Sequence, residues 1–222
     1  MTRPVSRRPR QGTVLDRTWY RRAETWLPVA VFLAALGVYT ATLGPTIDFW
    51  DCGKYVTTSH IVGVPHQPGT PLYVLVGRVF DIVFGQPDTS QPSYSTAWAV
   101  NFMSAIFSAL AVMMVYVIIA RVARRNDPDT GWLGRIGALV GAAFLLFSDT
   151  FWNNAIEAEV YGLAGFMMTL LTWVSLVWYE HRSERRSNWL LLLLIYLCGL
   201  GVGFHLGSLL VFPAFFVMVW LA

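Results

Sequence analysis

Long apolar runs that alternate with short polar connectors dominate this chain. The first run, residues 26–43, has about 18 positions without a charge, and five more runs cover residues 97–120, 133–147, 161–179, 189–204 and 206–222. A helix needs about 20 mostly apolar residues to cross the hydrocarbon core of a bilayer. The pattern therefore predicts an all-α integral membrane protein with about six membrane helices.

The first connector is long, polar and irregular. Its first part, residues 44–71, reads GPTIDFWDCGKYVTTSHIVGVPHQPGTP and mixes charged residues with Gly and Pro. Within it, residues 51–62 predict a short helix on the membrane surface. Residues 71–85 predict a second helix of only about 22 Å, shorter than the roughly 30 Å hydrocarbon core, so we expect a surface or re-entrant helix there. Residues 86–96 are expected to form a polar loop.

The composition agrees with a membrane protein. Hydrophobic residues make up 55% of the chain and charged residues 13%, whereas soluble domains carry about 25% charged residues. The net charge of +3 does not indicate a nucleic-acid partner, because the basic residues gather in three clusters beside apolar runs. We therefore expect membrane lipids, and no nucleic acid, among the partners.

The arginines predict the orientation. Seven precede the first run, four lie within residues 121–135 and three within residues 182–186. The alternate connectors contain only Lys54 and Arg78 against seven acidic residues: Asp48, Asp51, Asp81, Asp88, Asp149, Glu157 and Glu159. Because cytoplasmic loops carry an excess of Lys and Arg, the basic N-terminal tail, residues 1–25, is predicted to be cytoplasmic. The acidic connectors then face the periplasm of a bacterial cell membrane.

Several smaller features complete the prediction. The last run ends in VMVWLA without a polar tail, so we expect residues 26–222 to be the N-terminal part of a larger transmembrane domain. Cys52 and Cys198 lie far apart, and neither a disulfide framework nor a zinc-binding spacing is present in the sequence. Asn101, a polar residue inside the second run, is expected to bind a neighbouring helix.

The strongest candidates for chemistry lie in the first connector. Asp48 and Asp51 are three residues apart and flank Phe49 and Trp50, whose rings suit the membrane interface. A carboxylate held at that level can act as a general base. The alternative is an ordinary solvated loop, in which Asp48 is a surface charge or a cap of the following helix.

Five segments, taken in order, resemble one family. They are FWDCGKY, GVPHQPGTPLY, NFMSAIFSAL, FWNNAIEAEVYGL and GLGVGFHLGSLL. Over roughly residues 26–222, the chain resembles the N-terminal membrane domain of a bacterial domain-of-unknown-function family related to vertebrate transmembrane protein 260. Both are similar to the GT-C protein O-mannosyltransferases. The resemblance implies a GT-C-like multi-pass helical bundle.

The resemblance also implies an activity. Such enzymes transfer a sugar, here expected to be mannose, from a polyprenyl-phosphate carrier to a hydroxyl acceptor such as Ser or Thr of a protein. We expect the reaction at the external membrane face, with inversion at the sugar. An acidic residue of the first external loop serves as the base. The lipid-linked sugar is a co-substrate, and no cofactor or metal is implied.

Carried over to this sequence, the catalytic base is Asp51, which matches the aspartate of the family's aspartate-x-glycine-glutamate pattern. Lys54 replaces the glutamate of that pattern. Either this change abolishes activity, or Asp48 supplies the second carboxylate, with Lys54 at the substrate. His66 stands in PHQPG, where the family has His-Pro-Pro-Gly, and is expected to bind substrate or to make a structural hydrogen bond in its loop.

Four further residues are candidates for substrate binding. Glu157 and Glu159 lie about 200° apart on a helix, so we expect only one to face the site, and the resemblance falls on Glu159 and Tyr161. His205 is expected there too, although a lone histidine is more often a packing residue. Arg78 is expected either to reach the donor phosphate or to snorkel to the membrane interface beside Asp81.

Two other functions compete with the enzyme hypothesis. A transporter or flippase of lipid-linked sugars would use the acidic residues for binding only. Such sites lie near the membrane midplane, whereas these acidic residues lie in connectors. The other possibility is an inactive fragment, for which Lys54 and the expected absence of a C-terminal half are the evidence. The position of the acidic residues favours the enzyme.

Overall fold

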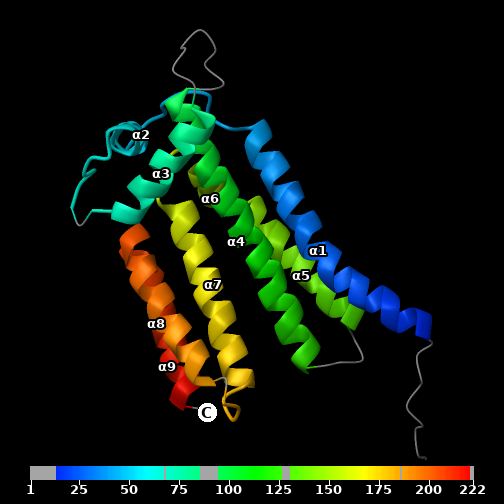
Figure 1. Cartoon of the computed structure of the whole chain (residues 1–222). Coiled ribbons are helices and arrows are strands. Elements are labelled where there is room, and N and C mark those ends of the chain that lie inside the picture. The colour runs from blue at the N-terminus through cyan, green and yellow to red at the C-terminus, as the bar shows by residue number, and fades with distance from the viewer. Residues whose placement is uncertain (1–13, 68, 86–94, 127–130, 186, 221–222) are drawn as a thin grey trace, which may run out of the picture.

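The computed structural model describes residues 14–67, 69–85, 95–126, 131–185 and 187–220. Every regular element in these ranges is a helix (Figure 1). The long helices are α1 (Val14–Ala41), α4 (Thr96–Asn126), α5 (Gly131–Leu146), α7 (Tyr161–Glu180) and α8 (Ser187–Phe204). The short ones are α2 (Cys52–Ile61), α3 (Pro71–Phe84), α6 (Asp149–Ile156), the 3-10 helix η3 (Leu206–Val211) and α9 (Phe212–Trp220). The all-α prediction is confirmed.

Three helices of the described chain, α4, α7 and α8, are long and apolar enough to cross a membrane. Helices α5 and α6 pass the same test together, but they are bent by 63° relative to each other. The apolar segments Thr25–Ala41 and Leu206–Trp220 are shorter. The structure thus supports a membrane protein with three spans, or four if the bent pair is one span. The count of about six stays a prediction.

The predicted surface helices of the first connector are present as α2 and α3. Pro71 starts α3, where its missing N–H costs nothing because the first helical N–H groups lack intrahelical partners. At the other end of the chain, α1 begins at Val14, so part of the predicted tail, residues 1–25, is helical. Arginine is a good helix former, and a basic cluster therefore marks a membrane edge without ending the helix. Most of the predicted loop 86–96 lies outside the described residues.

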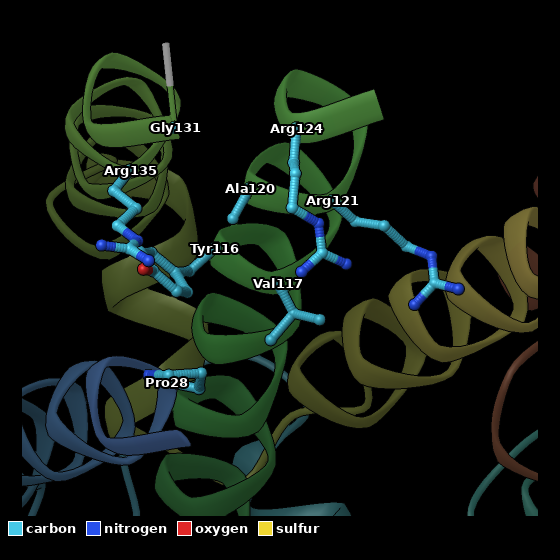
Figure 2. Close-up of a pocket in the computed structure, with 8 residues that line it drawn as sticks. All are labelled: Pro28, Tyr116, Val117, Ala120, Arg121, Arg124, Gly131 and Arg135. Atoms are coloured by element: carbon cyan, nitrogen blue, oxygen red, sulfur yellow. The ribbon is translucent and has the colours of Figure 1, made fainter. Parts of the chain in front are cut away.

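The two ends of the bundle differ in chemistry. Figure 1 shows the first connector, with α2 and α3, at the same end as the start of α7. We call this the acidic end. The C-terminal part of α4, the start of α5 and the junction of α7 with α8 lie at the opposite end, which we call the arginine end. There, Arg121, Arg124 and Arg135 line one pocket (Figure 2).

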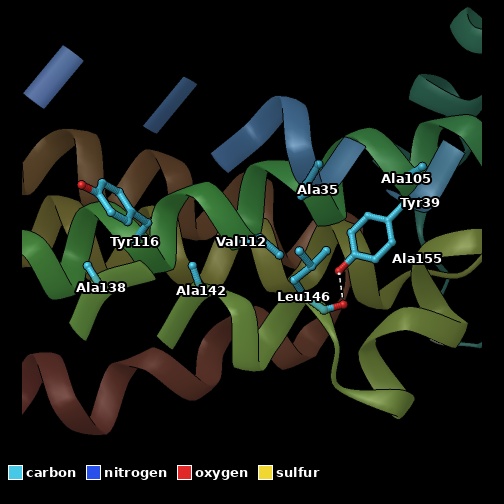
Figure 3. Packing of buried hydrophobic residues seen from close by; sticks show 10 residues of the cluster. Ala35, Tyr39, Ala105, Val112, Tyr116, Ala138, Ala142, Leu146 and Ala155 are labelled. Atoms are coloured by element: carbon cyan, nitrogen blue, oxygen red, sulfur yellow. Dashed lines mark hydrogen bonds between the residues drawn. The ribbon is translucent and has the colours of Figure 1, made fainter. Parts of the chain in front are cut away.

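Small residues form the core between α1, α4 and α5 (Figure 3). Its fully or almost fully buried members include Ala35, Ala105, Ala109, Ala138 and Ala142. Small side chains let helix backbones approach closely, which is how helices associate where lipid tails are as apolar as the core. The Tyr39 hydroxyl donates to the backbone oxygen of Leu146 at 3.1 Å, and so satisfies a carbonyl at the end of α5.

Asn101 of α4 binds the first connector and, as expected, another helix: its Oδ1 accepts from the Sγ of Cys52, the first residue of α2, at 3.8 Å. The side chain of Asn101 is fully buried, and its Nδ2 donates to the backbone oxygens of Gly44 at 2.7 Å and Thr46 at 3.1 Å. The Gly44 N–H donates in turn to the backbone oxygen of Ile156 at 3.0 Å. One buried amide therefore joins the first connector to the centre of the bundle and brings it beside the end of α6.

Candidate active site

A cavity of about 110 Å³ opens at the acidic end. Its walls come from the start of α2, the segment between α2 and α3, the segment before α7, and the junction of α8 with η3. Five predicted site residues line it: Asp51, His66, Glu159, Tyr161 and His205. The other lining residues are Tyr55, Gly69, Thr70, Val160 and Leu206. The fold thus brings together candidates from three separate connectors.

Asp51 enters the cavity from the N-cap position of α2. Its carboxylate makes no capping hydrogen bond and instead forms an ion pair with the Lys54 ammonium, at 2.6 Å between Oδ1 and Nζ. Both side chains are part-exposed, 44% for Asp51 and 39% for Lys54. An ion pair this exposed contributes little to stability. The pair therefore places a carboxylate in the cavity and a cation at its rim.

Helix α2 is bracketed by two residues in the left-handed region of backbone conformation. Trp50, directly before Asp51, has φ of 59°, and Val62, the C-cap residue, has φ of 54°. This conformation is unfavourable for residues other than glycine, above all for the β-branched Val62. Strained backbone of this kind is concentrated at functional sites. Here it lies directly before the carboxylate that lines the cavity.

Glu159 reaches the cavity from the short segment between α6 and α7. Its backbone is held by Ser104 of α4, whose Oγ accepts from the Glu159 N–H and donates to the Glu159 carbonyl, both at 3.4 Å. Glycine at position 162 makes this close approach possible, because a Cβ there would lie 2.5 Å from the Ser108 Oγ. Glu159 is consequently buried, with 7% of its surface exposed.

Burial makes Glu159 the most perturbed carboxyl group of the cavity. Desolvation, followed by the negative charges of Glu157 and Asp51, raises the pKa of Glu159 to about 7. Glu157 does not line the cavity. Its pKa is also raised, first by burial and then by the charge of Asp48. A carboxyl group that titrates near neutral pH is suited to proton transfer or to hydrogen-bond donation.

The two histidines and Tyr161 complete the polar wall. The Nδ1 of His205 accepts from the Gly207 N–H at 3.0 Å, so a neutral His205 ring carries its proton on Nε2. Burial, followed by the charge of His66, lowers the pKa of His205. His205 is therefore neutral at pH 7. The rings of His205 and Tyr161 meet edge to face with centroids 5.5 Å apart, while His66 lies 5.9 Å from the ring of Tyr55.

Three predicted residues do not line the cavity. Lys54 lies at its rim through the ion pair with Asp51. Asp48 is exposed and accepts a hydrogen bond from the Phe49 N–H at 2.8 Å. Arg78 pairs instead with Asp81, at 2.6 Å between Nη1 and Oδ2. Asp81 is itself buried, so the structure places Arg78 as its counter-charge within α3.

Tyr55 and Thr70 line the cavity but were not identified from the sequence. Burial, followed by the charges of Glu159 and Asp51, raises the pKa of Tyr55, so its phenol stays protonated and can donate. The Thr70 hydroxyl is buried without a hydrogen-bond partner among the described residues. Tyr55 is four positions from Asp51 and therefore shares its helix face, which is the signal that identifies it. No sequence signal marks Thr70.

A second, apolar cavity of about 230 Å³ lies between α7, α8, η3 and α9. Its walls include Leu171, Leu194, Val211 and Phe215. Helix η3 contributes to both cavities, because its first residue, Leu206, lines the polar cavity and Ser208 lines the apolar one. In the described part of the chain, no group of three or more His, Cys, Asp or Glu is placed to hold a metal ion.

The fold and this cavity define a class: a membrane protein built from a helical bundle, with carboxylates and imidazoles gathered at one end. Within that class, the chain belongs to the family described as "Protein O-mannosyl-transferase TMEM260 N-terminal domain", whose model matches residues 51–222. The relation to transmembrane protein 260 that the five sequence segments indicated is thus confirmed.

Two curated relatives carry the same family name. The chain is 26% identical to protein O-mannosyl-transferase tmem260 of Dictyostelium discoideum over 151 residues, which cover 68% of this chain and 17% of the relative. It is also 26% identical to protein O-mannosyl-transferase TMEM260 of Mus musculus over 174 residues, which cover 78% and 22%. The chain therefore spans about one fifth of the length of these relatives. No solved structure matches the chain.

Proposed function

We propose that this chain forms the N-terminal membrane part of a protein O-mannosyltransferase that uses a polyprenyl-phosphate mannose donor. The observation that carries the proposal is the meeting of Asp51 and Glu159 in one cavity, together with His66 and His205. Both curated relatives are named as protein O-mannosyl-transferases. The geometry adds a set of groups suited to activating a hydroxyl and accommodating a phosphate.

In the proposed reaction, the hydroxyl oxygen of a Ser or Thr acceptor attacks C1 of mannose. The bond between C1 and the phosphate oxygen breaks, and the polyprenyl phosphate leaves with the electron pair. Asp51 takes the proton from the hydroxyl as general base. Attack opposite the leaving group inverts the configuration at C1. Asp51 is suited to this role because it lines the cavity and remains 44% exposed, so an acceptor from the aqueous side can reach it.

The leaving phosphate gains negative charge in the transition state, and groups placed there in advance stabilise it. We assign this task to three hydrogen-bond donors at the cavity: the Lys54 ammonium, the His205 Nε2–H and the Tyr55 hydroxyl. Glu159 contributes through its protonation state, because a neutral carboxyl group can donate to a phosphate, whereas an ionised one repels it. With a pKa of about 7, Glu159 changes between these states near neutral pH.

The apolar cavity is suited to the hydrocarbon chain of a lipid-linked donor. A lipid-linked sugar carries a polar phosphate beside a long hydrocarbon chain, and η3 contributes residues to both the polar cavity and the apolar one. We further propose a GT-C-like bundle with six membrane passages. Four are the single helices α1, α4, α7 and α8, and two are the helix pairs α5–α6 and η3–α9.

The orientation follows from the arginines. If the arginine end faces the cytoplasm, as the positive-inside rule predicts, the acidic end and its cavity face the periplasm of a bacterial cell membrane. The side chains of Phe49 and Trp50 are 81% and 94% exposed, and rings at a membrane interface occupy the headgroup level. They would hold Asp51 at the depth where a lipid-linked sugar and an aqueous hydroxyl meet.

The proposal is tested with the full-length protein, a labelled polyprenyl-phosphate mannose and a Ser/Thr-containing acceptor. Removing a general base typically costs about 10²–10⁴-fold in rate, so Asp51→Asn should lower turnover by that factor while donor binding changes little. Asp48→Asn is the matched control, because Asp48 is an exposed aspartate of the same connector outside the cavity, and it should cost much less.

Two results would contradict the proposal in different ways. If Asp48→Asn abolishes transfer and Asp51→Asn leaves it intact, the base has been assigned to the wrong carboxylate. If the protein binds the donor, never transfers its sugar, and moves labelled lipid-linked sugar across vesicles, it is a transporter. The position of Asp51 and Glu159 in connectors at one end of the bundle favours the enzyme, because transporter sites lie near the midplane.

A further inference from the structure

A second polar pocket lies at the arginine end, remote from the cavity described above (Figure 2). Its volume is about 180 Å³, several times the roughly 30 Å³ that one water molecule occupies in the liquid. The pocket is formed by three helices: α1 contributes Pro28, α4 contributes its last turns, and α5 contributes Gly131 and Arg135. The proposed sugar transfer gives this pocket no role.

Helices α4 and α5, which both line the pocket, pack very closely against each other. A Cβ at Gly134 would lie 2.8 Å from the Cβ of Ala123, and one at Gly141 would lie 2.4 Å from the Cδ1 of Ile119. These contacts fix the separation of the two helices. Arg124 projects from α4 and Arg135 from α5, and both line the same hollow (Figure 2).

Arg121 occupies a different position in the same group. Its guanidinium points towards α7 (Figure 2) and forms a two-pronged ion pair with Glu180, in which Nε lies 3.1 Å from a carboxylate oxygen and Nη2 makes a second, short contact. Arg125 pairs with the same carboxylate at 3.7 Å. The carboxylate of Glu180 therefore lies on the α7 side of α4, and Arg124 and Arg135 line the pocket.

The surroundings indicate which kind of anion the pocket would take. Trp26 of α1 and Trp132 of α5 are 67% and 62% exposed, and exposed tryptophans next to membrane helices occupy the headgroup level. Leu133 and Ile136 of α5 are also exposed, which leaves an apolar surface beside the pocket for acyl chains. Basic pockets between helices at the cytoplasmic side are suited to anionic lipid headgroups.

We propose that this pocket binds the phosphate of an anionic phospholipid headgroup, with Arg124 and Arg135 as its two principal ligands. A guanidinium offers paired N–H donors in a fixed plane that match two oxygens of a phosphate. Two such groups, on α4 and α5, line this pocket. The buried Tyr116 and the aliphatic Val117 and Ala120 form the floor beneath it.

The simpler explanation is that these arginines serve only as a topology signal. A topology signal depends on charge and not on the geometry of the donors. Replacing both pocket residues, Arg124→Lys with Arg135→Lys, keeps the charge and removes the paired donors. Replacing both with Gln removes the charge as well. Arg185→Gln is the matched control, because Arg185 lies exposed at the same end and does not line the pocket.

The test measures lipid binding to the full-length protein in phosphatidylcholine nanodiscs that contain increasing phosphatidylglycerol. Native mass spectrometry counts retained phosphatidylglycerol, and thermal unfolding reports the accompanying stabilisation. Because charge-assisted hydrogen bonds are the strongest of the polar contacts, the double Gln variant should bind phosphatidylglycerol at least about tenfold more weakly. The double Lys variant should lie between this and the wild type, and Arg185→Gln should match the wild type.

A separate arm adds inorganic phosphate to the protein in pure phosphatidylcholine. We expect no stabilisation at millimolar phosphate, because the free ion lacks the acyl chains that hold a lipid beside the pocket. Equal stabilisation by free phosphate would overturn the assignment to a lipid. Phosphatidylglycerol binding that is the same in the wild type, the double Gln and the Arg185→Gln proteins would overturn the site itself. Unfolding of each variant in pure phosphatidylcholine shows whether the fold is retained.

Discussion

A glutamate at the acidic end and one at the arginine end lie in opposite electrostatic environments. At the arginine end, the part-buried Glu180 receives ion pairs from Arg121 and Arg125. At the acidic end, Glu159 is more deeply buried, its nearest charged neighbours include Glu157 and Asp51, and its pKa is raised to about 7. One carboxylate is therefore stabilised as an ion, and the other is held where ionisation is unfavourable.

This difference separates structural from chemical use of charge. A fold selected for stability alone pairs its buried and part-buried carboxylates, as Arg78 pairs the buried Asp81 and Arg121 pairs the part-buried Glu180, because an unpaired buried charge is costly. Carboxyl groups with raised pKa values, gathered in a cavity, are typical of sites that move protons. The acidic end contains such a cavity, and the bundle as a whole supplies the rigidity that holds it together.

The largest effect on stability is expected at Asn101, which attaches the acidic end to the bundle. Asn101→Ala leaves the carbonyl oxygens of Gly44 and Thr46 without their amide donor. A buried polar group that loses its partner costs about 1–3 kcal/mol. These two hydrogen bonds are part-buried, so each should cost an amount in the lower part of that range, and the free energy of unfolding should fall by about 2–4 kcal/mol. Thermal unfolding in detergent measures this. Asn154→Ala, which removes one bond within α6, should cost less than half as much, and equal costs would contradict the anchoring role.

Glu159→Gln should stabilise the protein above neutral pH. The pKa of Glu159 is about 7 in the fold and about 4.3 in an unfolded chain, so the fold favours the neutral form. Stability is therefore lost as the pH rises between these two values, and the full cost is present above pH 7. At pH 8 the variant should be more stable than the wild type by about 1–3 kcal/mol, and at pH 4 the two should be equal.

The matched control for that comparison is Asp48→Asn. Asp48 is exposed, and its charge raises the pKa of Glu157 but not that of Glu159, so Asp48→Asn should give a much smaller stabilisation above neutral pH than Glu159→Gln. The wild type and Glu159→Gln also test the proposed role of Glu159 at the donor phosphate. Donor binding by the wild type should weaken as the pH rises through about 7, whereas Glu159→Gln should bind the donor with a flat pH profile. A destabilised Glu159→Gln protein at pH 8 would show that its carboxylate is paired after all.

The same Glu→Gln substitution at the arginine end should destabilise the protein. Glu180→Gln leaves Arg121 and Arg125 without their counter-charge. The side chains of Arg121 and Glu180 are each about one fifth exposed. The loss of stability should therefore lie between the values for exposed and buried ion pairs, at about 1–2 kcal/mol. Apparent Tm values at low and high salt measure it. Glu184→Gln, an exposed residue of the same end, should be neutral, and equal shifts in the two variants would contradict the pairing.

Much of the fold is predictable from the sequence because continuous apolar runs identify membrane helices. The short helices α2 and α3 follow from Pro and Gly punctuation in the first connector, as Pro71 at the start of α3 illustrates. The start of α1 does not follow, because the arginines before residue 26 change the hydropathy without breaking the helix. The 63° bend between α5 and α6 also has no sequence signal beyond the polar residues near it.

The candidate site was predictable only in part. Asp51, His66, Glu159, Tyr161 and His205 were found through short motifs, and the structure shows that they share a cavity. The hold of Asn101 on the first connector could not be predicted from the sequence, because two of its partners are backbone oxygens about 55 residues away. Arg78 illustrates the same limit. Its nearest acid, Asp81, is one helical turn away and buried, and burial decides that the two residues pair.

The most direct test of the account asks which end of the bundle holds the donor. A photoactivatable polyprenyl-phosphate mannose analogue, irradiated with the full-length protein and mapped by peptide mass spectrometry, reports the site without relying on turnover. We expect crosslinks within residues 159–161 and 205–212, which contribute to the polar and apolar cavities, and their loss when unlabelled donor is in excess. Competed crosslinks confined to residues 116–135 of the arginine end, with none at the acidic end, would contradict the account.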